Sequence, residues 1–383
     1  MSFESALAAP GFGAIAEFKR RSPSAGDLRP EGDVVTIVAA YERSGARAVS
    51  VLVDDRFGGS WDDLRSARAA TSLPLLAKGF FSTHAHLETA RDAGADAVLL
   101  LLRDLDDGVV AELIAAARSL GLDTLVEAHD ADELDRAVAL RAPVIGINAR
   151  DLSSFAIDRA SQLELVTRAP RNRVVIAESA IATRAQAAAA ELAGANAVLI
   201  GSTLMRARDP GGTLAELLSR PLVKVCGLTR QDDVDAAVEA GADLVGFILA
   251  EESPRRAADL LDAPDTVLRV AVFVGAAEET AADVVQLYER EDGHRSRDAS
   301  LLRAGRRVGT VIDLPWEADD PTHLERARRA SGRVMLAGGL GPHNVRAAID
   351  EISPWAVDSA RSTESSPGVK DHDALRAWVA AAR

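Results

Sequence analysis

The stretches SGARAVSVLV (44–53), AGADAVLLLL (93–102) and LAGANAVLIGS (192–202) repeat one pattern, and this pattern decides the fold. Each has a glycine where a helix is expected to end and begins an apolar strand two residues later. Glycine suits that position because it tolerates the left-handed conformation that caps a helix. Helix, glycine and strand recurring in this order predict alternating β and α units. A fourth copy, AGADLVGFIL (240–249), lies beyond the first series and predicts that the architecture begins again.

The first part of the chain contains eight short apolar runs, each followed by a helical pattern, which is the strand number of a (β/α)8 barrel. The predicted strands are 15–18, 48–53, 74–80, 97–102, 124–128, 144–148, 174–179 and 197–202. The second part contains seven such runs: 223–226, 245–249, 270–274, 284–288, 308–313, 334–338 and 356–358. Segment 289–307 lacks a full βα unit, and the sequence is also compatible with a hairpin that turns at Ala304 and Gly305.

The predicted fold class is therefore α/β, with two tandem (β/α)8 TIM-type barrels, the second of which lacks one βα unit on this count. The length of 383 residues agrees, because one ordinary barrel takes about 250 residues. We place the join at LSRPL (218–222), which gives domains 1–220 and 221–383. We expect the two barrels to pack on each other.

Composition limits the function classes. A hydrophobic fraction of 48% with 27% charged residues is typical of a globular protein. No apolar run approaches the length of a membrane span, and the N-terminal residues lack the regions of a signal peptide, so we expect a cytoplasmic protein. A net charge of -14 argues against a nucleic-acid partner, which would require a basic surface. The single cysteine, Cys226, excludes an intramolecular disulfide.

Charged and amide side chains recur at the ends of the predicted strands of the first barrel. They are Glu17, Lys19, Lys78, Glu127, Asn148 and Glu178. A charge at the end of a buried strand is costly to desolvate unless it opens into a polar pocket, and strand ends converge at the carboxyl face of a barrel. The pattern therefore predicts an active site there. His84 and His86 have the spacing of a metal pair, but no further ligands accompany them at matching strand ends, so no metal site is predicted.

Two ordered sets of motifs resemble known enzyme families. The first set resembles indole-3-glycerol-phosphate synthase and comprises EFKRRSPS (17–24), LLAKGF (75–80), LVEAH (125–129), GINARDL (146–152), IAESAI (176–181) and LIGSTLM (199–205). The second set resembles phosphoribosylanthranilate isomerase and comprises KVCGLTR (224–230), VGFI (245–248) with SPR (253–255), VFV (272–274), LAGGLGPHNV (336–345) and ESSPGVKDHD (364–373). The resemblance implies a bifunctional enzyme of tryptophan biosynthesis that acts on small phosphorylated, anthranilate-derived substrates without a cofactor.

For the first barrel, the resemblance implies ring closure, decarboxylation and dehydration of carboxyphenylaminodeoxyribulose phosphate. It implies that Lys78 is the general acid at the carbonyl under attack and that Glu127 is the general base. Lys19 holds the substrate carboxylate and donates a proton in the dehydration. Glu17 and Glu178 position the two lysines and favour the developing cation.

The resemblance also implies substrate-binding residues. Asn148 is expected to hydrogen-bond a substrate hydroxyl. The phosphate is expected at backbone N–H groups near Ser22, Ser179, Gly201 and Ser202. The chain departs from the family pattern at Gly79, where the family has an acidic residue, and at Ala180, where it has glycine. We expect Gly79 to fix the position of Lys78 less firmly, and Ala180 to leave the phosphate less space to approach its binding site.

For the second barrel, the resemblance implies an Amadori rearrangement with Cys226 as base and Asp313 as acid. Arg255 is expected at the anthranilate end of the substrate, and Gly338 and Gly339 at its phosphate. Asp358, in the last strand, is also expected to bind the substrate, although the family pattern DxSSG is replaced there by DSARS. The family string QLHG is replaced by QLYE (286–289).

We expect the Cys226 thiol, at a strand end near a phosphate-binding rim, to ionise more easily than a buried thiol. An alternative hypothesis is that the second barrel is a non-catalytic module that stabilises a monofunctional synthase. Whether Cys226 and Asp313 face one cavity distinguishes the two hypotheses.

Overall fold

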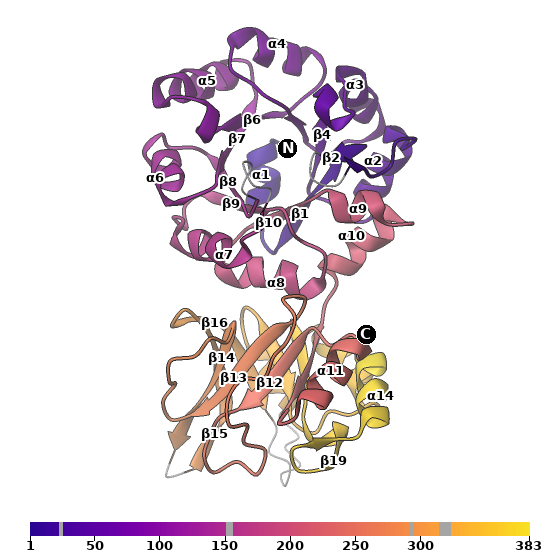
Figure 1. Ribbon diagram of the computed structural model, residues 1–383, viewed down its shortest axis with the longest axis vertical. Helices are drawn as coiled ribbons and strands as arrows, with labels where there is room; N and C mark the ends of the chain where they lie inside the picture. The colour runs from indigo at the N-terminus through magenta and orange to yellow at the C-terminus, as the bar shows by residue number, and fades with distance from the viewer. Residues whose placement is uncertain (23–25, 151–155, 292–293, 314–322) are drawn as a thin grey trace. The chain divides into compact units, whose positions relative to one another are not determined.

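The computed structural model describes residues 1–22, 26–150, 156–291, 294–313 and 323–383, and contains two closed eight-stranded barrels (Figure 1). The chain divides into two compact units, residues 1–182 with 190–218 and residues 183–189 with 219–383. The predicted fold class of two tandem barrels is confirmed. The assignment of functional domains to 1–220 and 221–383 stays a prediction. No helix in the described parts of the chain is both long and apolar enough to span a membrane.

The first barrel is fully parallel, and all eight of its strands lie where the sequence predicts them. The strands are β1 (Gly13–Phe18), β4 (Ala48–Leu52), β5 (Leu75–Lys78), β6 (Ala97–Leu101), β7 (Asp123–Ala128), β8 (Val144–Asn148), β9 (Val174–Glu178) and β10 (Ala197–Ile200). The barrel closes because β1 pairs with both β4 and β10. A short antiparallel pair, β2 (Arg21–Ser22) and β3 (Gly26–Asp27), follows β1.

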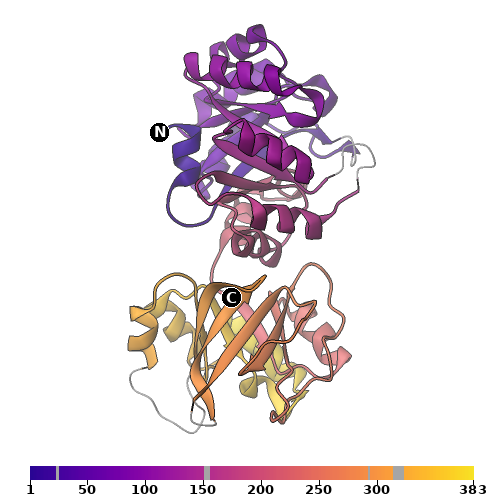
Figure 2. The same ribbon diagram turned by 90° about the vertical axis from the view of Figure 1, so that its left-hand side faces the viewer.

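Helices surround these strands as a ring, which Figure 2 shows from the side. They are α2 (Val34–Arg43), α3 (Trp61–Ala70), α4 (His84–Asp92), α5 (Asp107–Ser119), α6 (Ala131–Ala139), α7 (Arg159–Arg168), α8 (Arg184–Ala193), α9 (Ser202–Arg206) and α10 (Pro210–Leu218). Helix α1 (Phe3–Ala8) packs Phe3 and Leu7 against interior strand residues such as Ile15 and Ile176. Because α1 leads into the start of β1, it covers the amino end of the barrel and leaves the carboxyl end for a site.

The second barrel has eight strands, one more than the seven predicted. They are β11 (Leu222–Cys226), β12 (Leu244–Ile248), β13 (Leu268–Val274), β14 (Val284–Glu291), β15 (His294–Arg303), β16 (Arg306–Asp313), β17 (Val334–Ala337) and β18 (Ala356–Ser359). The additional strand is β15, which pairs antiparallel with both β14 and β16. The hairpin that turns at Ala304 and Gly305 is present, and both residues have positive φ. The count of seven strands was therefore wrong, because β15 is the eighth. The described residues between β14 and β16 do lack the helix of a βα unit.

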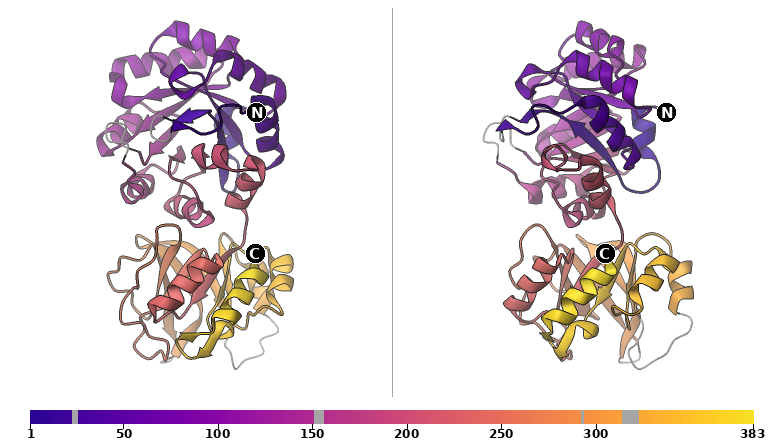
Figure 3. Two further views of the ribbon diagram at one scale, coloured as in Figure 1. Left: turned by 45° about the vertical axis from the view of Figure 1, so that its right-hand side comes forward. Right: turned by 90° about the vertical axis from the view of Figure 1, so that its right-hand side faces the viewer.

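Helices cover only part of the second barrel. They are α11 (Gln231–Ala240), α12 (His323–Arg329), α13 (Val345–Ile352) and α14 (His372–Ala382), and a small hairpin of β19 (Glu364–Ser366) and β20 (Val369–Lys370) precedes the last of them. Helices α11 and α14 lie side by side (Figure 3) and bury Val234, Leu375 and Trp378 in the core. Segment 249–283 forms β13 and loops but no helix.

Candidate active sites

Lys78 is the centre of the first site. At the end of β5, its Nζ lies 2.7 Å from Glu178 Oε2, 3.4 Å from Glu17 Oε2 and 3.9 Å from Glu127 Oε2. These carboxylates come from β9, β1 and β7, so the closure of the barrel brings Lys78 next to Glu178, which lies 100 residues away in sequence. The Nζ of Lys19 lies 2.7 Å from Glu17 Oε1. The six strand-end residues predicted from the sequence thus form one cluster, to which Asn148 is joined through Glu127.

Two glycines make room for the carboxylates. A β-carbon at Gly146, in β8, would lie 2.1 Å from Glu178 Oε1. One at Gly201 would lie 2.3 Å from Glu17 Oε1 and 2.9 Å from Lys19 Nζ. Side-chain atoms do not approach this closely, so both positions require glycine to keep the lysines and carboxylates in place. Gly201 therefore leaves space for Glu17 and Lys19, and it also lies at the predicted phosphate site.

The cluster sets the charge of its members. Burial disfavours the Lys78 ammonium, but Glu178, Glu17 and Glu127 outweigh it and raise the pKa of Lys78 above its ordinary value. Burial likewise disfavours the Glu17 carboxylate, yet Lys19 and Lys78 lower its pKa. Burial and the charge of Glu127 raise the pKa of Glu178 to about 7, against the opposing charge of Lys78. Lys78 is therefore a protonated donor in the free protein.

His129 is a member of this site that the sequence analysis missed. Its Nε2 lies 3.1 Å from Glu127 Oε1, and its Nδ1 lies 3.0 Å from Glu133 Oε2 in the first turn of α6. The contact between His129 Nε2 and Glu127 Oε1 is an ion pair without the alignment of a hydrogen bond. Asn148 Nδ2 donates to the same Glu127 oxygen at 3.0 Å. Glu127 Oε2 is buried and has no hydrogen-bond partner among the described residues.

The histidine and the base hold each other charged. Burial disfavours the imidazolium, but Glu127 and Glu133 outweigh it and raise the pKa of His129 to about 10. Burial opposes ionisation of Glu127 too, yet contacts with His129 and Lys78 lower its pKa to about 2. Glu127 is therefore ionised at neutral pH, as a general base must be.

The predicted phosphate residues lie on loops that begin at the same end of the barrel. Ser179 follows β9, Gly201 and Ser202 begin α9, and Ser22 is buried in β2. Thr203 Oγ1 donates to the carbonyl oxygen of Ile181 at 2.6 Å and so ties the start of α9 to the loop after β9.

The two departures from the family pattern have local consequences. Ser179 and Ala180 both have positive φ, 71° and 55°, so Ala180 occupies the left-handed conformation that glycine adopts without strain. Gly79 leaves little space for a side chain, since a β-carbon there would lie 3.0 Å from Val53 Cγ2.

The second barrel contains a cavity of about 640 Å³. All six residues predicted for this site line it: Cys226, Arg255, Asp313, Gly338, Gly339 and Asp358. Cys226 and Asp313 therefore face one cavity, which is the arrangement expected of an enzyme and not required of a structural module. Gly338 and Gly339 both have positive φ, 78° and 66°, as close backbone turns around a ligand require.

Asp313 is held by two residues that the sequence analysis did not assign. Tyr288 Oη and Arg295 Nη1 each donate to Asp313 Oδ2 at 2.8 Å. The Arg295 guanidinium also stacks over the Tyr288 ring at 4.1 Å. Tyr288 stands in QLYE, where the resembling family has histidine, and Arg295 comes from the antiparallel strand β15. The unusual hairpin thus brings a cation to the proposed acid.

The prediction that Cys226 ionises easily was wrong for the free protein. The residue is only 4% exposed, and this burial raises the pKa of its thiol, although Lys224 opposes the effect. Lys224 is itself fully buried, with Nζ 2.8 Å from Asp358 Oδ2 and 3.0 Å from Gln286 Oε1. A strand end near the rim predicts an accessible thiol, whereas the Cys226 thiol is buried at the wall of the cavity.

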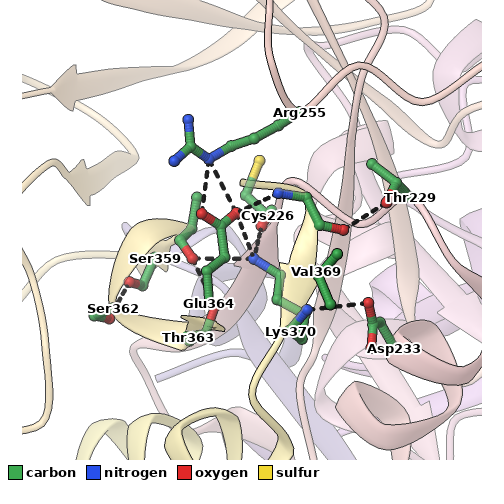
Figure 4. Close-up of polar contacts among 12 residues, drawn as sticks. Cys226, Thr229, Asp233, Arg255, Ser359, Ser362, Thr363, Glu364, Val369 and Lys370 are labelled. Atoms are coloured by element: carbon green, nitrogen blue, oxygen red, sulfur yellow. Dashed lines mark hydrogen bonds and ion pairs between the residues drawn. The ribbon is translucent and has the colours of Figure 1, made fainter. Parts of the chain in front are cut away.

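A second buried lysine organises the loops around Cys226 (Figure 4). Lys370 Nζ donates to the carbonyl oxygen of Cys226 at 2.6 Å and to Glu364 Oε1 at 3.3 Å. Arg255 Nε lies 2.9 Å from both oxygens of Glu364. Arg255, predicted to contact the substrate, is therefore held at the cavity wall by Glu364 in the free protein.

The rarity of lysine is a sequence signal that could have identified Lys224 and Lys370. Among 44 basic residues the chain has only four lysines, Lys19, Lys78, Lys224 and Lys370, and the rest are arginines. All four lie in the two candidate sites. Arginine cannot release a proton in a protein, whereas lysine is a compact donor whose pKa responds to its surroundings. A chain that uses arginine elsewhere retains lysine where chemistry or tight space requires it.

The fold and the two residue clusters define a two-barrel enzyme with a candidate active site in each barrel. A family model described as indole-3-glycerol phosphate synthase matches residues 1–217, and one described as N-(5'phosphoribosyl)anthranilate (PRA) isomerase matches residues 317–381. The tryptophan biosynthesis protein TrpCF of Yersinia pestis is 34% identical over 96% of this chain and 84% of its own length. Indole-3-glycerol phosphate synthase 2 of Streptomyces coelicolor is 45% identical over 56% of this chain and 84% of its own length.

Among solved structures, the phosphoribosyl anthranilate isomerase of Thermus thermophilus is 27% identical, with a TM-score of 0.35, over 42% of this chain and 98% of its own length. The chain belongs to the indole-3-glycerol phosphate synthase family and, over its whole length, to the bifunctional TrpCF proteins of tryptophan biosynthesis. It is a lyase joined to an isomerase.

Proposed function

We propose that the first barrel converts carboxyphenylaminodeoxyribulose phosphate to indole-3-glycerol phosphate, and that the second makes this substrate from phosphoribosylanthranilate. The observation that carries the first assignment is Lys78 Nζ, within 4 Å of three buried carboxylates. The cluster keeps a proton donor and an ionised base close together, which ring closure followed by dehydration requires.

In the first barrel, the aromatic carbon attacks the substrate ketone, and Lys78 donates a proton to the ketone oxygen as it becomes a hydroxyl. Carbon dioxide leaves, and its bonding electrons return to the ring. The hydroxyl then leaves as water with a proton from Lys19, while Glu127 removes the proton whose loss restores aromaticity. Glu17 and Glu178 stabilise the positive charge that develops on the ring nitrogen.

Substrate binding in this barrel uses polar groups around the same mouth. Asn148, which donates to Glu127, would also contact a substrate hydroxyl. The phosphate would lie at the backbone N–H groups of the loop after β9 and the start of α9. The residues assigned to it are Ser22, Ser179, Gly201 and Ser202.

In the second barrel, Asp313 donates a proton to the furanose ring oxygen, and the ring opens to an iminium ion. The Cys226 thiolate then removes the proton from the neighbouring carbon, and the resulting enol rearranges to the ketone. Arg255 would bind the anthranilate carboxylate after exchanging Glu364 for it. Gly338 and Gly339 would bind the phosphate, and Asp358, which also lines the cavity, accepts a hydrogen bond from Lys224.

Separate assays of the two reactions on the purified full-length protein test the proposal. Cys226→Ser should abolish the isomerase reaction and leave the synthase reaction unchanged, because serine is a far weaker base of similar shape. The proposal for the second barrel fails if the wild-type protein does not turn over phosphoribosylanthranilate, or if Cys226→Ser and Asp313→Asn both turn it over at the wild-type rate.

A further inference from the structure

The proposed isomerase base has a cation beside it that no part of the proposed mechanism uses. Lys224 and Cys226 are two residues apart on β11, so their side chains point to the same face of the strand, into the barrel. Gly246, in β12, pairs with Cys226 of the neighbouring strand β11. A β-carbon at Gly246 would lie 2.7 Å from Cys226 Sγ and 2.9 Å from Lys224 Cε. The thiol and the lysine stem therefore meet over the bare backbone of Gly246.

A purely structural role explains this lysine poorly. Lys224 is fully buried, and its ammonium is balanced by Asp358 at 2.8 Å and Gln286 at 3.0 Å. Buried ion pairs can often be replaced by apolar residues of similar volume at no loss of stability, so stability alone does not require one here. The second oxygen of Asp358, Oδ1, is buried without a hydrogen-bond partner among the described residues, so the pair is also incompletely satisfied.

We propose that Lys224 is a positioning residue for the isomerase base, whose ammonium stabilises the Cys226 thiolate while Asp358 holds that ammonium in place. This inference rests on the proposed role of Cys226. A thiol inside a barrel needs a nearby cation to ionise, because burial alone favours the neutral form. The cation must also be compact enough to lie beside Gly246, which lysine is and the broader guanidinium of arginine is not.

The charged groups around the thiol define the electrostatics that the experiment must resolve. The thiol faces Lys224 on its own strand, Asp358 on β18 and Lys370 from the end of β20, and Asp358 is in turn influenced by Asp313 on β16. Lys224 and Lys370 lower the pKa of Cys226, while burial, the largest cause, and Asp358 raise it. Removing Lys224 and removing the charge of Asp358 should therefore shift the thiol in opposite directions.

The experiment uses the fact that Cys226 is the only cysteine in the chain, so every thiol signal comes from it. The rate of alkylation by iodoacetamide is measured against pH for the full-length wild-type protein, Lys224→Met and Asp358→Asn. The reagent has access because Cys226 lines the open cavity. We expect the midpoint to rise by about one pH unit or more in Lys224→Met and to fall in Asp358→Asn. The thiolate also absorbs at about 240 nm, so its absorbance against pH gives an independent midpoint. Cys226→Ser serves as the blank.

Opposite shifts in the two variants support the proposal, because general misfolding would move both midpoints in the same direction. The double variant Lys224→Met with Asp358→Asn removes the pair without leaving an unpaired buried charge, and its midpoint should again lie above that of Asp358→Asn. Equal midpoints in the wild-type protein and in Lys224→Met, by both methods, would overturn the proposal. Loss of isomerase activity in Cys226→Ser, with no midpoint shift in Lys224→Met, would refute this inference alone and keep the proposed function.

Discussion

Replacing Lys78 by methionine should abolish formation of indole-3-glycerol phosphate, because the change removes the proton donor and keeps the buried stem. General acid catalysis contributes about a hundred- to ten-thousandfold, which corresponds to about 2.7–5.5 kcal/mol in the activation free energy. The loss should appear in kcat more than in KM, since the carbonyl oxygen takes the proton only as the bond forms.

The structure also predicts a cost in stability. Lys78 Nζ lies 2.7 Å from Glu178, and loss of one partner of a buried pair destabilises a protein by about 3–5 kcal/mol. The double variant Lys78→Met with Glu178→Gln should recover part of that free energy without recovering kcat. This comparison separates lost chemistry from lost folding.

The assay follows indole-3-glycerol phosphate formation in the full-length protein. The isomerase reaction of the same sample is an internal control, because every residue proposed for it lies after residue 220. The smallest effect of a general acid is about a hundredfold. Retention of more than about one tenth of the wild-type kcat would therefore exclude Lys78 as the acid and refute the reasoning.

Three further predictions test the organisation, the charge and the packing of the first site. A fragment of residues 1–218 should be folded and retain synthase activity, and a folded but inactive fragment would contradict the assignment of the site to this part of the chain. The pKa of His129 is raised to about 10 in the folded protein, from about 6.5 unfolded, so its stabilising contribution is complete below pH 6.5 and lost as the pH rises towards 10. His129→Gln should therefore lower the free energy of unfolding in urea much more at about pH 6 than at about pH 10. An equal loss at both pH values would contradict the ion pairs. Gly201→Ala should lower synthase kcat/KM by displacing Glu17, whereas Gly108→Ala, in α5 with nothing within 4 Å of the new carbon, is the matched control and should change nothing. Wild-type kinetics in Gly201→Ala would show that Glu17 can move without loss.

The first barrel could be predicted almost completely, because its strands are short, apolar and separated by glycine-capped helices. Each predicted strand there coincides with an observed one. The second barrel was harder to predict because β15 reads HRSRDASLLR and alternates only weakly between buried and exposed residues. An antiparallel strand with solvent on one side carries charges that a buried parallel strand does not. The predicted hairpin at Ala304 and Gly305 was the correct signal.

Polar residues at strand ends could be predicted because the barrel brings all strand ends to one face, whatever the loops do. What the sequence could not supply was the pairing between these residues. Nothing in LVEAH indicates that His129 is fixed by Glu133, four residues later and one helical turn into α6. Nor does KVCG indicate that Cys226 is buried, because burial depends on the hairpin β19–β20 and on Lys370, which are about 140 residues away. The direction of a pKa shift is a property of the assembled site and not of the motif.

The two sites differ in the charges that lie next to the group proposed to transfer the proton. In the first barrel, three buried carboxylates surround Lys78, so the excess is negative and the lysine is kept protonated as a donor. In the second barrel, Lys224 and Lys370 lie around the Cys226 thiol, so the cations favour a base that burial alone would keep neutral. Each barrel thus places its two lysines where a proton must be given or a thiolate must form. On one type of fold, the neighbouring charges therefore favour the ammonium at Lys78 and oppose the burial that keeps Cys226 neutral.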